Sequence, residues 1–258
     1  MGKAENYMEI LKNKKDWDTF LLDESGLPGP RGNLELVDAV AQAGDIDRFR
    51  RYLAYDADSA PYGSSLEFLP VCGAVGLGRL IAEGQADLLD TLRPYASDPR
   101  WRVREGVAIG LQKFGDKDID GLLLAMEVWV RGNLLERRAV AAAICEPRLL
   151  KKKENAKRAL DLLDKITEDL THEQNRRQED FKVLRKSLAY CWSVAAAADP
   201  QDGRILMEKW FLIHDSDVLW IMKENLKKNR LRRLDPSWAV RWEDKMAAHV
   251  VDIISPGK

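Results

Sequence analysis

Trp101 and Glu105 are the two residues whose types and spacing could together do chemistry. They are four apart in the stretch SDPRWRVREGV, residues 97–107, so a helix presents both side chains on one face. An indole face attracts a cation, and a carboxylate stabilises positive charge beside it. A Trp that recurs in a repeat also packs between helical layers, and a Glu also pairs with bases of neighbouring repeats. The sequence leaves both interpretations open.

Basic side chains recur along the helices that we expect to line a concave surface. They are Arg102, Arg104, Arg137, Arg138, Arg185, Lys186, Lys223, Lys227 and Lys228, followed by Arg230, Arg232 and Arg233. Such a lining could follow a phosphate backbone. The alternative is that these residues form ion pairs between repeats, for which the 42 Asp and Glu residues offer partners.

Two glycine-rich segments resemble nucleotide-binding loops only superficially. In residues 25–33, SGLPGPRGN, Pro28 and Pro30 remove backbone donors, and no Gly-Lys-Ser/Thr follows. We expect a rigid turn that ends at Asn33, the cap of the next helix. Residues 72–78, CGAVGLG, lack the dinucleotide spacing, and their glycines indicate close packing between helices.

The cysteines and histidines do not form a recognisable site in the sequence. Cys72, Cys145 and Cys191 are far apart in apolar surroundings, which predicts buried free thiols rather than disulfides or a zinc site. The histidines lack metal-ligand spacing and are expected at the surface; they are His172, His214 and His249. We therefore expect no metal and no cofactor.

A repeated phrase indicates how these residues are positioned. Residues 97–107 and 216–226 both read Ser-Asp, then Trp, a basic residue and Glu at the same places. In the first copy, Asp98 is expected to cap a helix with Pro99 at its first position. Such recurrence is typical of helical-repeat proteins, and packing between layers would bury Trp101 and its counterpart Trp220.

The apolar periodicity and the breakers predict helices throughout. Single helices are expected over 5–22, 34–43, 46–55 and within 65–83, and a capping segment over 238–254. Helix pairs are expected over 87–96 with 99–114, 118–131 with 134–145, 155–170 with 173–198, and 201–213 with 217–228. The predicted fold is all-α, a right-handed α-solenoid of HEAT-like antiparallel helix pairs in a single domain over 1–258. Residues 1–86 form its N-terminal helices, 87–235 its clearest repeats and 236–258 its C-terminal cap.

Composition agrees with a helical protein. The 258 residues are 45% hydrophobic and 32% charged, and the formal net charge is −1, which does not suggest a strongly basic nucleic-acid binder overall. The N-terminus lacks a basic-then-apolar leader, and no run of about 18 apolar residues is expected to span a membrane. We expect a cytoplasmic protein without membrane association.

Three short motifs stand on successive expected inner helices. The first is Trp101 with Glu105, the second is LERR at 135–138, and the third is Lys-x-x-x-aromatic at 186–190. Together with the repeats, these motifs resemble the AlkD-type alkylpurine DNA glycosylases, DNA alkylation repair enzymes that are built from HEAT-like repeats. The resemblance covers about residues 87–235.

The resemblance implies excision of cationic alkylated purines from duplex DNA, with positive charge building on the deoxyribose. Glu105 would stabilise that charge, Trp101 and Tyr190 would face the cation, and Arg138 would hold a flanking phosphate. The family has Asp in place of Glu105 and Trp in place of Tyr190. In a second alignment of the closing helix, Lys223 takes the lysine position and Lys227 replaces the aromatic residue.

Two functions are therefore expected to compete. One is a DNA-backbone-binding protein that excises cationic alkylpurines through Trp101, Glu105, Arg138 and Tyr190. Its DNA contacts would come from Arg104, Arg137, Arg185, Lys186, Lys223, Lys227 and Lys228. The other is a non-catalytic scaffold that holds a protein partner. A continuous positive groove would favour DNA, and a surface of alternating charge would favour a protein.

Overall fold

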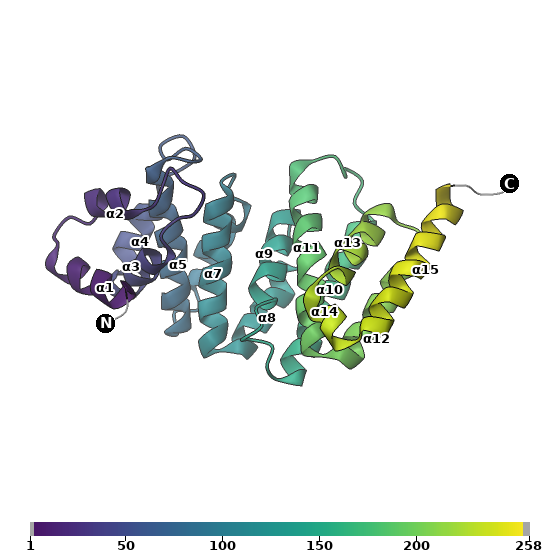
Figure 1. Cartoon of the computed structure of the whole chain (residues 1–258). Coiled ribbons are helices and arrows are strands. Elements are labelled where there is room, and N and C mark those ends of the chain that lie inside the picture. The colour runs from purple at the N-terminus through teal and green to yellow at the C-terminus, as the bar shows by residue number, and fades with distance from the viewer. Residues whose placement is uncertain (1–2, 255–258) are drawn as a thin grey trace. The chain divides into compact units, whose positions relative to one another are not determined.

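The computed structural model describes the backbone of residues 3–254, and all regular secondary structure in that range is helical (Figure 1). This confirms the all-α prediction. The chain divides into two compact units, Met1–Leu122 (unit 1) and Leu123–Lys258 (unit 2). The division falls inside helix α8, Ile119–Trp129. The single repeat domain over 1–258 stays a prediction.

Unit 1 is built around helix α5, which is almost entirely buried. Its regular elements are α1 (Lys3–Asn13), α2 (Asp18–Glu24), α3 (Leu34–Ala43), α4 (Ile46–Leu53), η1 (Ser65–Glu67), α5 (Phe68–Ala82), α6 (Leu88–Leu92), η2 (Arg93–Ser97) and α7 (Trp101–Lys117). Helices α3, α4 and α7 all pack against α5. The core of unit 1 therefore forms around one apolar helix.

The glycines of α5 allow that packing, as their pattern predicted. A Cβ built on Gly78 would lie 2.1 Å from the Cα of Gly110 in α7, and one on Gly76 would lie 2.3 Å from the Phe49 ring. Side chains at these positions would force the helices apart. Residues 65–82 are also apolar and long enough to cross a membrane, contrary to our expectation that no such stretch exists. However, 78% of this stretch is buried inside the unit, as in a core helix.

Several helix ends lie where local sequence predicted them. The side chain of Asn33 accepts a hydrogen bond from the backbone N–H of Leu36, and Asp45 does the same for Arg48. The predicted single helix over 5–22 is wrong, because α1 ends at Asn13 and α2 begins at Asp18. Between them, the buried Trp17 indole donates to the Leu11 carbonyl at 2.9 Å and so closes the end of α1.

The predicted start of α7 is also wrong. The helix begins at Trp101, and Asp98 does not cap it. Asp98 binds Arg100 instead: Oδ1 of Asp98 accepts from the Arg100 backbone N–H at 2.8 Å, and Oδ2 accepts from Arg100 Nη2 at 2.7 Å. Arg100 is 2% exposed and also donates to three carbonyls, those of Tyr55, Asp56 and Ala60. Because every guanidinium nitrogen has an acceptor, this buried arginine ties the start of α7 to the loop after α4.

Unit 2 is built around α11 in the same way. Beyond its part of α8, its elements are α9 (Leu134–Ile144), α10 (Lys153–Thr171), α11 (Glu179–Ala198), α12 (Pro200–Phe211), α13 (Ser216–Leu226), α14 (Asn229–Leu234) and α15 (Pro236–Ile254). Helix α11 contacts α9, α13, α10 and α12 (Figure 1). Helix α10 also contacts α12, so neighbouring pairs bury one another's apolar faces.

Two buried polar residues fix the register of α11. The Trp192 indole is fully buried and donates to Thr167 Oγ1 on α10 at 3.0 Å. Asn225 on α13 accepts from the Ser193 backbone N–H at 2.8 Å and donates to the Leu188 carbonyl at 2.9 Å. These bonds satisfy buried groups that would otherwise cost free energy, and they align the helices that carry the candidate basic residues.

In the second copy of the repeated phrase, the helix begins four positions earlier within the phrase than it does in the first copy. Asp215 caps α13 by accepting from the N–H groups of Asp217 and Val218, so Ser216 is already the first helical residue. Trp220 is the fifth residue of α13, whereas Trp101 is the first residue of α7. The two tryptophans are therefore not equivalent positions, although the words around them match.

Helix α11 begins later than the predicted 173–198. Residues 172–178 form a loop, in which Arg176 donates to the Thr171 carbonyl at 2.7 Å and to both oxygens of Asp215. Burial opposes ionisation of Asp215, but the bonds from Arg176 and from the Val218 N–H outweigh it, so the pKa of Asp215 lies below its ordinary value. The hydrogen bonds that Arg176 donates to Asp215 and Asp217 raise the pKa of Arg176.

Candidate nucleic-acid interface and pocket

The eleven predicted site residues fall into two groups, one in each unit. Trp101, Arg104 and Glu105 belong to α7 in unit 1. The other eight belong to helices α9, α11 and α13 of unit 2 or to the turn after α13; they are Arg137, Arg138, Arg185, Lys186, Tyr190, Lys223, Lys227 and Lys228. The geometry therefore defines a pocket in unit 1 and a basic surface in unit 2.

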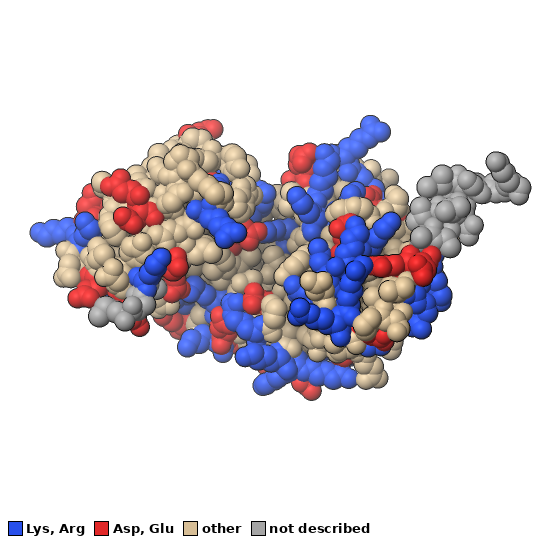
Figure 2. Space-filling model, in the orientation of Figure 1, with Lys and Arg blue, Asp and Glu red and all other residues tan. Residues whose placement is uncertain are grey.

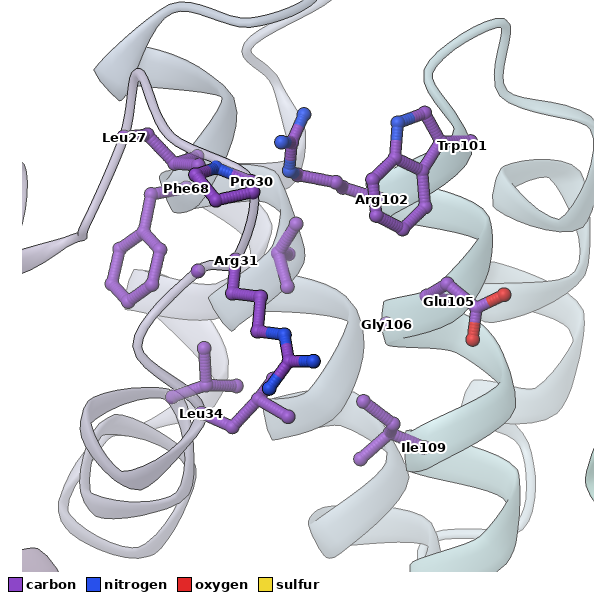
Figure 3. Close-up of a pocket in the computed structure, with 13 residues that line it drawn as sticks. Leu27, Pro30, Arg31, Leu34, Phe68, Trp101, Arg102, Glu105, Gly106 and Ile109 are labelled. Atoms are coloured by element: carbon purple, nitrogen blue, oxygen red, sulfur yellow. The ribbon is translucent and has the colours of Figure 1, made fainter.

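The pocket of unit 1 has a volume of about 270 Å³ and mainly apolar walls (Figure 3). It is lined by Leu27, Pro30, Arg31, Gly32, Leu34, Val37, Phe68, Val71, Trp101, Arg102, Glu105, Gly106 and Ile109. The loop between α2 and α3 supplies one wall, and α7 supplies the opposite wall (Figure 3). The turn over 25–33 was predicted, but its place as a pocket wall was not.

Trp101 lies at this pocket. It is not packed between helical layers, although one interpretation of the repeat had expected that packing. Its side chain is 41% exposed, so the prediction that Trp101 is largely buried is wrong. Trp101 is the first residue of α7. Glu105 follows one turn later, half-buried, at the rim of the same pocket. Trp101 and Glu105 thus border one pocket from the same helix, and the chemical role predicted for the pair stays a prediction.

Arg102 holds the pocket together and does not serve as a free cation. Its Nη1 lies 3.1 Å from the fully buried Glu67 carboxylate, and its Nη2 donates to the Gly29 carbonyl at 2.8 Å. Its guanidinium carbon is 4.6 Å from the centroid of the Trp101 ring. Glu67 Oε1 and Arg102 Nε, both buried, lack hydrogen-bond partners. Arg102 thus links α7 to the loop and to η1.

Gly26 and Ser25 shape the loop that Arg102 reaches. Gly26 has φ +74°, and a Cβ there would lie 2.9 Å from the Arg31 carbonyl, so this position requires glycine. The buried Ser25 hydroxyl donates to the Leu22 carbonyl at 2.8 Å and accepts from the Leu27 N–H at 3.0 Å. The peptide bond between Leu27 and Pro28 is cis. The loop that these residues shape lines one side of the pocket.

Arg104 contacts the backbone just before α7. Its Nη1 donates to the carbonyls of Asp98 at 2.6 Å and Pro99 at 3.0 Å. The predicted DNA contact of Arg104 stays a prediction, and its observed contacts are structural.

In unit 2, some predicted DNA-binding residues are engaged in ion pairs, as the alternative interpretation anticipated. Arg185 pairs with Asp217, and its guanidinium carbon lies 4.1 Å from the centroid of the half-buried Trp220. Arg137 donates to the Val130 carbonyl at 3.1 Å and lies 3.6 Å from Asp169. Lys227 pairs with Glu224. Arg138 is half-buried on α9.

A different set of cations gathers around Tyr190. Tyr190 is 47% exposed, and its hydroxyl accepts a hydrogen bond from Arg230 Nη2 at 2.6 Å. The Arg230 guanidinium carbon lies 4.6 Å from the Tyr190 ring centroid, and Lys228 Nζ lies 5.9 Å from it. Lys186 is one turn before Tyr190 on α11 and is exposed. The sequence had not predicted Arg230 as a partner of Tyr190.

Lys223 and Lys227 extend this set along α13, which packs beside α11. Lys186 and Lys223 are both exposed and have no ion pair within the described part of the chain. We call the six residues the cationic surface: Lys186, Tyr190, Lys223, Lys227, Lys228 and Arg230. In Figure 2, lysine and arginine side chains gather over the part of unit 2 where α13 and α14 lie.

The near-zero net charge conceals opposite charges on the two units. Unit 1 has 15 Lys and Arg residues against 21 Asp and Glu residues, a formal charge of −6. Unit 2 has 26 against 21, a formal charge of +5. Positive charge is therefore concentrated in the unit that contains the cationic surface, where it attracts an anionic polymer more strongly than the total suggests.

The cysteines and histidines lie as expected where the structure describes them. All three cysteines are buried and none of them forms a disulfide within the described part of the chain, and burial raises the pKa of the Cys72 and Cys145 thiols. His172 and His214 are exposed, while the side chain of His249 lies outside the described residues. Among the described residues, no three His, Cys, Asp or Glu side chains gather as metal ligands do.

Comparison of the chain with protein-family models, with curated proteins and with solved structures finds no match. The resemblance to AlkD-type glycosylases accordingly rests on the residues and motifs alone.

Proposed function

We propose that the chain binds the phosphate backbone of duplex DNA through the cationic surface of unit 2. The observation that carries this proposal is the pair of exposed lysines on the packed helices α11 and α13, Lys186 and Lys223, together with the half-buried Lys228 and Arg230 against Tyr190, in a unit with a formal charge of +5. Cations without a protein partner release condensed counterions when they meet phosphates, which drives association. An exposed phenol held by a guanidinium adds a rigid polar contact beside them.

The arrangement of unit 2 supports this use. Because α11 and α13 are locked together by Asn225, the cations on the two helices keep a constant spacing. The ion pairs of Arg137 with Asp169 and of Arg185 with Asp217 join neighbouring helices of the same unit. We propose that the helix pairs stack in the right-handed, HEAT-like manner, because α11 contacts both α9 and α13 while α10 contacts α12.

A salt-dependent titration with a short duplex tests the proposal. The wild-type chain, Lys186→Gln and Lys223→Gln are compared at several salt concentrations. Each substitution should weaken binding similarly for unrelated sequences and lower the slope of log K against log salt by about one unit. Arg50→Gln, an exposed arginine in unit 1, serves as the matched control and should leave the slope unchanged.

The competing scaffold function predicts a different result. If the wild type binds duplex with no salt dependence, or if both lysine variants keep the full slope, the surface does not contact phosphates. A protein partner would then be the better explanation of exposed cations beside an exposed tyrosine.

A second candidate function is the excision of cationic alkylated purines, and one observation favours it. Trp101 is exposed at a pocket rim that Glu105 shares, which is where an aromatic face and a carboxylate could meet a cationic nucleotide. A buried Trp101 would have removed this candidate. Release of methylated purines from treated duplex tests it directly.

A further inference from the structure

The pocket of unit 1 has features that neither DNA binding nor purine excision uses. Its walls come from apolar residues of the loop and of α3, α5 and α7, among them Leu27, Phe68 and Ile109. An apolar cavity of about 150 Å³ holds benzene, so one of about 270 Å³ has room for a two-ring molecule. The apolar lining favours a ligand with an aromatic or branched hydrocarbon body.

The charged side chains that line the pocket indicate which polar group such a ligand would carry. Arg31, on the loop, is exposed and has no ion pair or hydrogen bond to another described residue. Its guanidinium is directed between Leu34 and Ile109, into the space between the loop and α7 (Figure 3). The other guanidinium at the pocket, that of Arg102, is engaged by Glu67 and Gly29.

Among the described residues that line the pocket, the one carboxylate is that of Glu105, and it does not face Arg31. The Glu105 carboxylate points away from Arg31 and from the loop (Figure 3). An uncommitted guanidinium therefore faces the apolar space without a carboxylate in front of it. Guanidinium groups bind carboxylates through two parallel hydrogen bonds.

We propose that this pocket binds a small organic acid, with its aromatic or branched apolar body among Leu27, Phe68 and Ile109 and its carboxylate on Arg31. The proposal concerns residues of unit 1 only and does not depend on DNA binding by unit 2. It assigns to the acidic unit an anion-binding site that the formal charge of −6 would not suggest.

Calorimetric titration with three probes of equal size tests the ligand class. The probes are 2-naphthoate, 2-naphthamide and 2-naphthylmethylammonium, without DNA present. We expect saturable binding of naphthoate with a dissociation constant on the order of 0.1–1 mM, about tenfold weaker binding of the amide, and the weakest binding for the ammonium ion. Equal affinity for acid and amide, or tightest binding of the ammonium ion, would overturn the proposal.

Substitutions then locate the site. Arg31→Gln should weaken naphthoate about tenfold and leave the amide unchanged, because only the charge contact is lost. Ile109→Trp should abolish binding of all three probes by filling the space, and Arg50→Gln is the control that should change nothing. Arg31 is exposed, so its variant should fold with an unchanged melting temperature. Unchanged naphthoate affinity in Arg31→Gln, or no saturable binding by the wild type, would refute the site.

Discussion

The guanidinium of Arg185 lies on the ring of Trp220, with its carbon 4.1 Å from the ring centroid, while Nη1 pairs with Asp217. Asp217 also accepts from Arg176, whose second partner, Asp215, caps α13. One chain of contacts thus runs from the loop before α11 to the start of α13. Trp220, the tryptophan of the second copy of the repeated phrase, therefore packs against an arginine.

Arg185→Gln should consequently change stability more than DNA binding. The substitution removes a cation–π contact and a partly buried ion pair, which together should lower the free energy of unfolding by about 1–2 kcal/mol. The slope of log K against log salt should fall less than for Lys186→Gln, the neighbouring exposed lysine. Urea unfolding and the duplex titration measure the two effects. A full one-unit fall in slope with unchanged stability would place Arg185 on the DNA.

The loss of stability caused by truncating each of three tryptophans should follow the order of their burial. Trp192→Ala, at a fully buried site, should cost about 3–5 kcal/mol, because it leaves a cavity and removes the hydrogen bond that Thr167 Oγ1 accepts from the indole. Trp220→Ala should cost about 1–2 kcal/mol, and Trp101→Ala less than about 1 kcal/mol. Equilibrium denaturation by urea gives all three values. A cost for Trp101→Ala as large as that for Trp192→Ala would mean that Trp101 is part of the core.

Local signals in the sequence were sufficient for the helices and many of their caps. Asn33 and Asp45 cap helices because a short side chain reaches an N–H two or three residues ahead, which requires no distant partner. Periodicity likewise identified α5 as a helix, and its glycines as contacts. These features depend on neighbours within a few residues, and such neighbours are visible in the sequence.

The misplaced elements depend on distant partners. Asp98 has the type and position of a cap, but Arg100 binds it because carbonyls 40 and 45 residues away orient that arginine. The pocket forms because Arg102 reaches the Gly29 carbonyl across 73 positions of sequence. Nothing in the turn over 25–33 indicated that contact. The exposure of Trp101 could not be predicted for the same reason, since it depends on where α7 begins.

Gly78→Ala should be among the most destabilising small substitutions in unit 1. The added Cβ would lie 2.1 Å from the Gly110 Cα, and a backbone atom cannot move aside as a flexible side chain can. We expect a loss of about 3 kcal/mol or more, from separation of α5 and α7. Gly32→Ala is the control: its Cβ would meet only ordinary contacts at 3.8 Å and beyond, so stability should change by less than about 0.5 kcal/mol. Thermal unfolding distinguishes the two.

The cap of α13 should contribute to the acid sensitivity of unit 2. The pKa of Asp215 is lowered in the folded chain, so its contribution to stability is complete above its unfolded pKa, about 3.9, and is lost as the pH falls through the lower folded value. Asp215→Asn keeps a capping oxygen but loses the charge that Arg176 pairs with. The variant should be less stable than wild type at pH 7, and the difference should shrink as the pH falls below about 4.

Asp45→Asn is the matched control for that measurement. Asp45 caps α4 in the same way and has no ion pair among the described residues. Its substitution should therefore give a smaller difference from wild type at pH 7. Urea midpoints between pH 2.5 and 7 provide the comparison. A difference between wild type and Asp215→Asn that grows as the pH falls would show that the sign assigned to Asp215 is wrong.

Glu105→Gln tests the proposed excision of cationic purines most directly. Glutamine is nearly isosteric with glutamate, so the fold and most of the affinity for duplex DNA should remain. A carboxylate that stabilises positive charge on the sugar in the transition state acts electrostatically, and its loss should lower the rate of methylpurine release by about two to three orders of magnitude.

Arg138→Ala separates backbone contacts from charge stabilisation in the same assay. If Arg138 holds a phosphate, its loss should weaken both duplex binding and release, whereas Glu105→Gln should reduce release alone. The readout is methylated purine freed from treated duplex, with buffer as the blank. Release by the wild type no faster than in buffer would end the enzyme proposal and leave Trp101 and Glu105 as residues of the pocket rim. An active wild type matched by Glu105→Gln would place the chemistry at another carboxylate.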